Sequence, residues 1–318
     1  MSKYRELFLG AVAALLIVAA AEVRADEVWV TNMKSANVTV FDAASYQVIA
    51  TIPAGKGAHN VVISGDGKLA LVANVGGNSV TVIDAAAKKV LGTVATGAKT
   101  HDVSLSPDGK WAIACNVGDG TITLIDVAKR QAVHTMPMGA KTMMSVFAPD
   151  GRTAYVAIAG ESKIDVLDLE SRAVVKSLPG GKGTMAFEPS PDWKQAWMTA
   201  PDDNKIVLID LVGGKALGSI EVADSPHGLV FSPDGSLGYV VRRAVNEVAI
   251  VDTAARKVVR SEFIGERPDM LAISPDGSTL YVTLRDEDKM AVLSTSDLST
   301  IAEVATGDEP HGIAYRRQ

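Results

Sequence analysis

Cysteine is nearly absent from this sequence, which has Cys115 alone among 318 residues. A single cysteine excludes an internal disulfide framework. No Cys-x-x-Cys-His motif occurs, so a covalently attached c-type haem is excluded as well. Basic residues are outnumbered by acidic ones, and the net charge is −6. A charge of this sign argues against nucleic acid as a partner, because phosphate binding needs clustered lysine and arginine.

Long apolar segments are also scarce, and the one that occurs lies at the start of the chain. Lys3 and Arg5 form a short basic beginning, residues 7–21 are almost wholly apolar, and Val23-Arg24-Ala25 resembles a cleavage site. This pattern predicts a secretory signal peptide over residues 1–25. An uncleaved anchor is the alternative, although the run is shorter than the about 20 residues that a spanning helix needs. We therefore expect a mature chain of residues 26–318, periplasmic or secreted, with no membrane span.

A repeat of 42 residues runs through almost the whole chain. Two of its features are a Pro-Asp-Gly or closely related turn and an aspartate that ends an apolar run. The turns lie at 65–67, 107–109, 149–151, 191–193, 233–235 and 275–277, and the runs end at Asp42, Asp84, Asp126, Asp168, Asp210 and Asp252, then Ser294. Because no insertion or deletion interrupts the period, we expect residues 26–318 to form a single domain, and a monomer.

Each copy of the repeat reads as four short strands separated by turn signals. Residues 103–106, 111–116, 121–126 and 132–136 are the strands of one copy, rich in β-branched residues. Four antiparallel strands per repeat fit a propeller blade, so seven copies predict an all-β, seven-bladed β-propeller. The mature chain opens on a segment that matches a second strand and closes on one that matches a first strand. We therefore expect the last blade to take its inner strand from the C-terminus and the others from residues 27–55.

Several segments carry a recognisable motif. They are Val28-Trp-Val-Thr-Asn32, Tyr239-Val-Val-Arg242 and Tyr281-Val-Thr-Leu284, beside Ser-Pro-Asp-Gly turns and Val-Ile-Asp endings. On these motifs the chain resembles the YVTN-repeat β-propeller family, relatives of cytochrome-type nitrite reductase and of quinoprotein propellers. Members that resemble this chain include periplasmic accessory proteins of redox pathways, cell-surface proteins and, more distantly, lactonases. The resemblance implies the fold and leaves the function open.

One position of the repeat is unusual in chemistry. At the start of the first strand the seven copies read His59, His101, Met143, Met185, His227, Asp269 and His311. First strands line the channel of a propeller, so these residues are expected to form a ring at one mouth. Imidazole, thioether and carboxylate are the ligands of a transition-metal site, which suggests copper or zinc. In Pro226-His-Gly228 and Pro310-His-Gly312 the alternative is a structural histidine bonded to the backbone of the next blade.

Charged residues are expected in the loops around the same mouth. Basic residues Lys56, Lys99, Lys141 and Lys182 lie before the first strands of four copies, whereas Asp224, Glu266, Asp308 and Glu309 occupy the rest of the circle, close to Arg242, Arg243 and Arg285. Such a rim suits a docking face for a ligand or for a periplasmic redox protein. The alternative is a solvated rim with local ion pairs.

Three functions remain open on the sequence. The first is a non-enzymatic periplasmic protein that binds a metal or small ligand at the ring and serves a redox pathway. The second is a lactonase-like hydrolase or lyase that uses the same mouth, with histidine as acid or base. The third is a scaffold for protein interactions without a ligand. Ring ligands are present and no catalytic set of arginine, glutamate and histidine can be placed, so the first is favoured and an enzyme is disfavoured.

Overall fold

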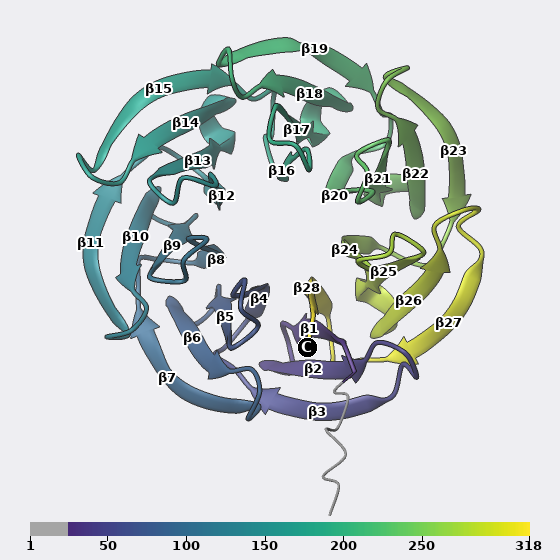
Figure 1. Ribbon diagram of the computed structural model, residues 1–318, viewed down its shortest axis with the longest axis horizontal. Coiled ribbons are helices and arrows are strands. Elements are labelled where there is room, and N and C mark those ends of the chain that lie inside the picture. Colours follow the sequence, from purple (N-terminus) through teal and green to yellow (C-terminus); the bar gives the residue numbers. More distant parts are fainter. Residues whose placement is uncertain (1–24) are drawn as a thin grey trace, which may run out of the picture.

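The computed structural model describes residues 25–318, which form seven four-stranded antiparallel sheets arranged in a ring (Figure 1). The expected seven-bladed propeller is confirmed. The predicted signal peptide falls almost entirely on residues 1–24, outside the described part of the chain. Within residues 25–318, no helix is long and apolar enough to cross a membrane.

The blades are numbered here along the chain, and each is given from the channel outward. Blade 1 is β4 (Ala58–Ile63), β5 (Leu69–Asn74), β6 (Ser79–Asp84) and β7 (Lys89–Ala95). Blade 2 is β8 (Thr100–Leu105), β9 (Trp111–Asn116), β10 (Thr121–Asp126) and β11 (Gln131–Pro137). Blade 3 is β12 (Thr142–Phe147), β13 (Thr153–Ile158), β14 (Lys163–Asp168) and β15 (Ala173–Pro179).

The second half of the ring repeats this arrangement. Blade 4 is β16 (Phe187–Pro189), β17 (Gln195–Ala200), β18 (Lys205–Asp210) and β19 (Lys215–Glu221). Blade 5 is β20 (Pro226–Phe231), β21 (Leu237–Arg242), β22 (Glu247–Asp252) and β23 (Lys257–Phe263). Blade 6 is β24 (Pro268–Ile273), β25 (Thr279–Leu284), β26 (Lys289–Ser294) and β27 (Thr300–Ala305), and blade 7 is β28 (Pro310–Arg316), β1 (Glu27–Asn32), β2 (Asn37–Asp42) and β3 (Val48–Pro53).

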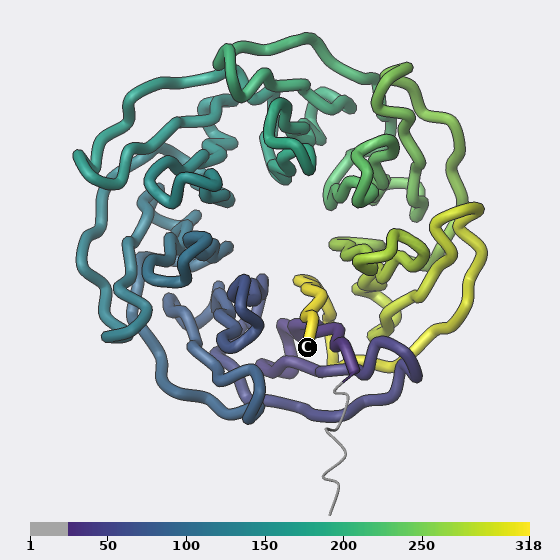
Figure 2. Tube along the Cα trace, viewed as in Figure 1, coloured from purple at the N-terminus to yellow at the C-terminus, as the bar shows by residue number. Residues whose placement is uncertain are grey.

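Blade 7 closes the ring by joining the two ends of the chain, as the phase of the repeat predicts. Strand β28 pairs antiparallel with β1, with Val28 opposite Tyr315 and Val30 opposite Ile313. Figure 2 shows the C-terminal strand seated inside the N-terminal strands of this blade. Beside the joint, the carboxylate of Glu27 is almost fully buried and accepts hydrogen bonds from Arg316 Nη1 at 3.0 Å and Lys88 Nζ at 2.6 Å. The two chain ends are therefore fastened to each other and to blade 1.

The recurring turn residues have structural roles. In blade 2 the Ser106 hydroxyl donates to Asp108 and accepts from the backbone N–H of Trp111, which fixes the turn between β8 and β9. Asp126 accepts the backbone N–H of Lys129 at 2.9 Å just after β10. Equivalent bonds follow the third strands of blades 1, 3, 4, 5 and 7. The repeat is thus explained mostly by turn chemistry and by packing between neighbouring blades.

Loops between second and third strands divide the ring into two groups. In blades 7, 1 and 2 the second strand ends in Asn32, Asn74 and Asn116, whose amides donate to a threonine of the third strand. In blades 3 to 6 the same loop is one turn of 3-10 helix: η1 (Ala159–Glu161), η2 (Pro201–Asp203), η3 (Arg243–Val245) and η4 (Arg285–Glu287). Because η3 and η4 each begin with arginine, these two loops bring cations to the channel mouth.

Candidate functional site

Three of the ring histidines are held in one tautomer by the backbone of the next residue around the ring. The Nδ1 atom of His101 lies 2.9 Å from the carbonyl oxygen of Met143, that of His311 lies 3.0 Å from His59, and that of His227 lies 3.2 Å from Asp269. A carbonyl oxygen only accepts, so Nδ1 carries the proton in each ring and Nε2 is left as the acceptor or ligand atom. The backbone bond that the structural alternative expects is present at Nδ1 of His227 and His311, and Nε2 of His101 and His311 remains available as a ligand atom, whereas Nε2 of His227 lies 2.6 Å from Arg243 Nη2.

Threonines of the second strands hold the backbone of the same ring. Thr31 donates its hydroxyl to the carbonyl of His59 at 2.8 Å, and Thr283 donates to that of His311 at 2.8 Å. Thr199 does the same for His227 at 3.0 Å. Each of these carbonyls belongs to the blade that follows the threonine, so the ring position is set from two neighbouring blades.

The imidazoles of His101, His59 and His311 form a stack across blades 2, 1 and 7. Ring centroids are 4.1 Å apart between His59 and His101 and 3.8 Å apart between His59 and His311. Burial lowers the pKa of His59 and His311 well below the ordinary histidine value, and the neighbouring imidazoles lower both further. Burial also lowers the pKa of His101 to about 4. These rings are therefore neutral at physiological pH, the state in which imidazole binds metals.

A small cavity lies where the ring faces the channel, with a volume of about 30 Å³. A site holds a water molecule when this volume exceeds about 10–15 Å³, so the cavity accepts one or two waters or a single ion. It is lined by His59, Asn60, His101, Asp102, Met144, Met185, Ala186, His227, Met270 and His311. Four of the seven predicted ring residues are thus the histidines of this lining, and Met185 is a fifth.

The cavity lining differs from strict strand alternation, which would turn Asn60 and Asp102 to the other face. Their strands contain an irregularity at the ring position, between Ala58 and Asn60 in β4 and between Thr100 and Asp102 in β8. A β-bulge leaves two successive residues on one face. Asn60 and Asp102 therefore line the cavity beside their histidines.

The same irregularity affects the predicted sulfur ligands. In β12 it lies between Thr142 and Met144, and Met144 lines the cavity, whereas Met143 contributes its carbonyl to His101. Met270 lines the cavity one residue after Asp269. The methionines that line the cavity are thus Met144, Met185 and Met270, and the sulfur of Met144 also accepts a hydrogen bond from the backbone N–H of Phe187 at 3.0 Å.

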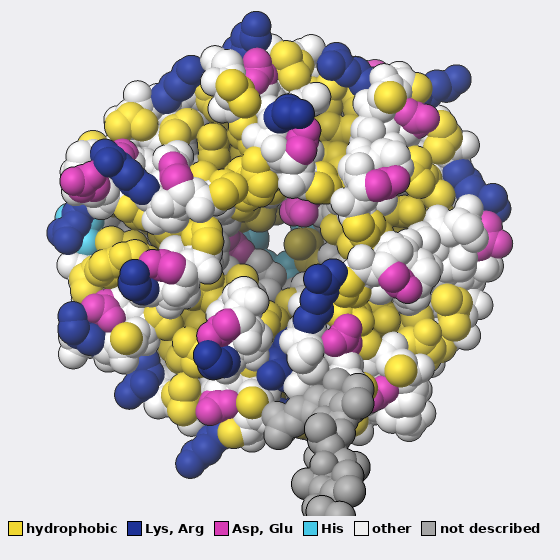
Figure 3. Space-filling view, in the orientation of Figure 1, with side chains coloured by type: hydrophobic (Ala, Val, Ile, Leu, Met, Phe, Trp, Pro, Cys, Tyr) yellow, Lys and Arg dark blue, Asp and Glu magenta, His cyan; other side chains and the backbone are white. Residues whose placement is uncertain are grey.

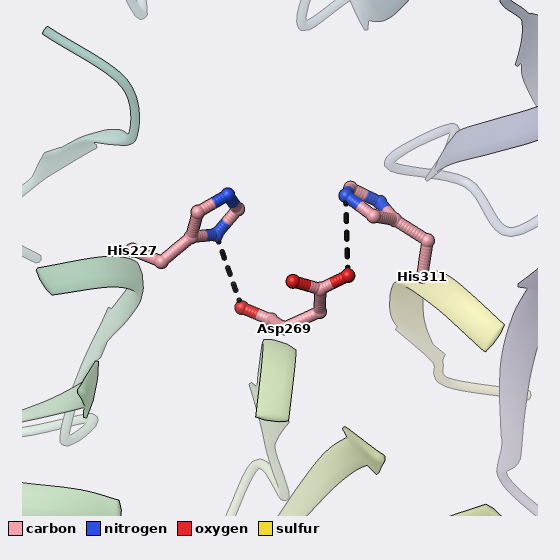
Figure 4. Close-up of side chains that lie close together, drawn as sticks. All are labelled: His227, Asp269 and His311. Carbon is pink, nitrogen blue, oxygen red and sulfur yellow. Dashed lines mark hydrogen bonds and ion pairs between the residues drawn. The ribbon is translucent and has the colours of Figure 1, made fainter. Parts of the chain in front are cut away.

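Asp269 lies between His227 and His311 (Figure 4), and these three residues together with Arg243 form a charged cluster. Its side chain is fully buried, and Oδ2 lies 3.7 Å from His311 Nε2. Ligand atoms of His227, Asp269 and His311 all lie within 4.8 Å of one another. Arg243 Nη2 reaches between them, in contact with Asp269 Oδ1 and 2.6 Å from His227 Nε2. The cation of Arg243 thus occupies the place where these three side chains would hold a metal ion.

The charged residues predicted at the rim fall into two groups, one held in local ion pairs and one exposed. Arg242 pairs with Asp224 and Glu247, and Arg285 Nη2 lies 3.2 Å from Glu309, so local pairing holds the acidic half. Lys56, Lys99, Lys141 and Lys182 are exposed, and within residues 25–318 their side chains take part in no ion pair. Figure 3 shows histidine and acidic side chains at the central opening of the molecule.

A second column of the repeat marks residues whose importance the structure reveals. At the residue after the second strand the seven copies read Met33, Val75, Val117, Ala159, Pro201, Arg243 and Arg285. Two arginines in an otherwise apolar column are a signal of function that alignment of the repeats contains. Their contact with Asp269 depends on the fold of η3 and η4.

Comparison with known proteins supports the propeller fold and does not identify a ligand for this chain. The family described as Cytochrome D1 heme domain, a family of eight-bladed propellers, matches residues 25–145. No curated protein matches the chain by sequence. Hydrazine synthase of Kuenenia stuttgartiensis is 20% identical, with a TM-score of 0.76 over 85% of this chain and 92% of that one.

Two further solved structures are similar in fold. Dihydro-heme d1 dehydrogenase NirN in complex with DHE is 18% identical, with a TM-score of 0.70 over 92% of this chain and 76% of that one. A candidate 6-phosphogluconolactonase from Bacteroides fragilis is 16% identical, with a TM-score of 0.80 over 94% of this chain and all of that one. At these identities the likeness is one of fold alone. The fold that the resemblance implies is confirmed: residues 25–318 form a seven-bladed β-propeller, of which residues 25–145 match the family described as Cytochrome D1 heme domain.

Proposed function

We propose that the protein is a non-enzymatic periplasmic propeller that binds one soft transition-metal ion, cuprous copper above zinc, in the cavity at the channel mouth. One observation carries this proposal. His101 and His311 donate Nδ1–H to backbone carbonyls, which leaves Nε2 as the free ligand atom beside a cavity of about 30 Å³. In metal sites, histidine ligands are oriented by a hydrogen bond of this kind from the ring nitrogen that does not bind the metal.

The rest of the lining favours a soft ion. Met144, Met185 and Met270 line the same cavity, and thioether sulfur favours Cu(I). The lowered pKa of His59 and His311 keeps both imidazoles neutral, so binding requires no proton release from them. The cationic Arg243 contacts His227, which lines the cavity, and an ion of low charge is repelled least by it.

Haem d1, the group named by the matching family, does not fit this cavity. The cavity holds only water-sized species, whereas a tetrapyrrole is a planar macrocycle many times larger. His59, His227 and His311 are each no more than 6% exposed, so they offer little surface against which a macrocycle could pack. The family's cofactor is therefore not part of the proposal.

Metal content of the mature chain tests the proposal directly. Protein purified from a periplasm is measured by elemental analysis and then titrated with Cu(I) under reducing conditions against a chromogenic chelator. The His101→Ala/His311→Ala double variant is compared with His134→Ala, which changes the remaining histidine on the outer strand β11. We expect one Cu(I) in wild type and in His134→Ala, and binding at least about tenfold weaker in the double variant. Equal affinity in all three proteins would refute the metal site.

A hydrolase is the second candidate, and the charged cluster supports it. His227, Arg243 and Asp269 contact one another at the mouth, so a base, a cation and a carboxylate are present together. Turnover of simple lactones that is lost in His227→Gln and kept in His134→Gln would establish this activity in place of the binding role. Absence of turnover in wild type would remove it.

The exposed lysines support docking of an acidic partner in a redox pathway, whether or not a metal is bound. Lys56, Lys99, Lys141 and Lys182 lead into four successive blades around the mouth. Electrostatic complementarity of this kind raises association rates. A scaffold without a ligand predicts that partner binding survives the double histidine variant, whereas a metal-dependent partner would lose affinity.

A further inference from the structure

The two arginines at the mouth have buried hydrogen-bond donors that the protein leaves unused. Within the described chain, the Nε atoms of Arg243 and Arg285 are buried and have no hydrogen-bond partner. Both guanidinium groups approach Asp269, Arg243 in direct contact and Arg285 Nη1 at 3.6 Å from Oδ2. A buried donor without a partner costs about 1–3 kcal/mol, more for a charged group. Asp269 Oδ2 is likewise buried without a hydrogen-bond partner, so the one carboxylate between the two arginines does not satisfy their Nε donors.

The charges around these arginines indicate that the acceptor is an anion. Asp269 is the one carboxylate that both guanidinium groups approach, while Glu309, the other partner of Arg285, is 44% exposed on its side chain. Burial, followed by the nearby cations Arg267 and Arg285, lowers the pKa of Arg243 to about 9, so crowding of positive charge is not fully relieved. At neutral pH Arg243 still carries its proton. An additional anion would relieve the crowding.

Nothing in the fold requires arginine at these two positions. The equivalent residues of the other five blades are Met33, Val75, Val117, Ala159 and Pro201. The loops η1 and η2 form the same 3-10 turn with Ala159 and Pro201 in first place. The 3-10 turn therefore forms without arginine at its first position, and the fold does not explain why Arg243 and Arg285 are there.

We infer that Arg243 and Arg285 form a binding site at the channel mouth for an oxyanion, a carboxylate or phosphate group of a small molecule. The planar guanidinium group presents paired N–H donors that match two oxygens of such a group. The exposed lysines of blades 1 to 4 surround the same mouth and raise the local concentration of anions. The site adjoins the cavity through His227, but neither arginine is a ligand of the proposed metal, so oxyanion binding measured on the metal-free protein tests it separately.

Binding of inorganic phosphate and of malonate to the metal-free, chelator-treated mature protein tests the site. Isothermal titration at constant ionic strength, with chloride as the reference anion, compares wild type with Arg243→Gln, Arg285→Gln and the control Arg260→Gln. Arg260 is an exposed arginine of β23 paired with Glu262. We expect wild type and the control to bind alike and each mouth variant to bind about tenfold more weakly. Preference for phosphate or for malonate identifies which source of oxyanion the site takes.

A variant that is expected to bind more tightly separates loss of the site from loss of the fold, because a misfolded protein would not gain affinity. Asp269 competes for both guanidinium groups, so Asp269→Asn is expected to bind the preferred oxyanion about tenfold more tightly than wild type. The unfolding transition in chloride confirms that each variant is folded. The inference is overturned if wild type binds phosphate and malonate no better than chloride, if the mouth variants bind like wild type, or if Asp269→Asn binds more weakly.

Discussion

The Nδ1 atom of His311 lies 3.0 Å from the carbonyl oxygen of His59, across the joint between the last strand of the chain and blade 1. The pairing that closes the ring of blades therefore also places His311 beside His59 at the channel mouth. The stack of His101, His59 and His311 exists only when β28 is in place. Variants that loosen the joint are expected to disturb the site, although they lie at the other end of the strand.

Removal of the buried carboxylate at this joint tests that connection. Glu27 accepts hydrogen bonds from Arg316, Lys88 and Trp29, and its side chain is 2% exposed. Loss of one partner of a buried ion pair typically costs about 3–5 kcal/mol, so Glu27→Ala is expected to lower the free energy of unfolding by that amount. Chemical denaturation of the metal-free protein measures it.

The matched control lies on the outer edge of the propeller. Glu303 pairs with Lys289 at 2.8 Å and its side chain is 42% exposed. Exposed pairs contribute about 0–1 kcal/mol, so Glu303→Ala is expected to be nearly neutral. Similar losses in the two variants would mean that Glu27 has no special role in closure.

Substitution of methionines distinguishes the ligand set given by the cavity lining, which includes Met144, from the one predicted by the repeat, which includes Met143. Met144 lines the cavity because of the irregularity in β12, and Met143 does not. Under the proposed function, Met144→Leu should weaken Cu(I) binding by about tenfold, whereas Met143→Leu should leave it unchanged. Chelator competition on the two variants, each close to wild type in volume, provides the measurement. The reverse ranking would restore the sequence-based ligand set.

The period of 42 residues predicts a great deal because each repeat is bounded by local turn chemistry. Ser106, Asp108 and Asp126 make their hydrogen bonds within a few residues, so their positions in the sequence predict the turns directly. The same period predicts the ring of four histidines and the closure by β28. Alternation fails at Asn60 because a β-bulge changes the face of the strand without changing the length of the repeat.

The contacts within the charged cluster are harder to predict from the sequence than the turns and the ring. Arg243 and Asp269 are separated by 26 positions and belong to different blades. Their contact depends on the 3-10 turn of η3, which has the same length as the asparagine turns of blades 7, 1 and 2. Equal spacing therefore conceals two loop conformations, and only one of them directs an arginine to the channel mouth.

Acid should destabilise the metal-free protein through the ring. A histidine whose pKa is lowered in the folded state takes up its proton more readily when unfolded, so its contribution to stability is lost as pH falls below about 6.5. His101 has a pKa of about 4, which corresponds to a loss of about 1–2 kcal/mol between pH 7.5 and pH 5. Denaturation at these two pH values should show a smaller loss in His101→Gln than in wild type.

Two carboxyl groups oppose this trend, so the comparison between variants is essential. Burial raises the pKa of Asp102 to about 6 and that of Glu188 to about 8. Each contributes stability at low pH that is lost as pH rises through its own pKa. Because both carboxyls are present in wild type and in His101→Gln, the difference between the two proteins isolates the imidazole. Parallel pH profiles would contradict a neutral, buried His101.

Gly312 is expected to be the least replaceable residue of the Pro-His-Gly segment in β28. A Cβ atom added there would lie 2.6 Å from the carbonyl oxygen of His59 and 2.7 Å from Asn60 Cα, both backbone atoms of blade 1. Steric overlap of this kind costs about 1–3 kcal/mol, and relief would require β28 to move away from β4. Gly312→Ala should therefore lower the free energy of unfolding and, by displacing His311, also reduce the affinity for Cu(I).

At Gly65 an added Cβ has its nearest neighbour at 3.8 Å, so Gly65→Ala is the control and should leave both measurements unchanged. A stable Gly312→Ala protein with wild-type copper affinity would show that close approach of blades 7 and 1 is not what positions the imidazole stack.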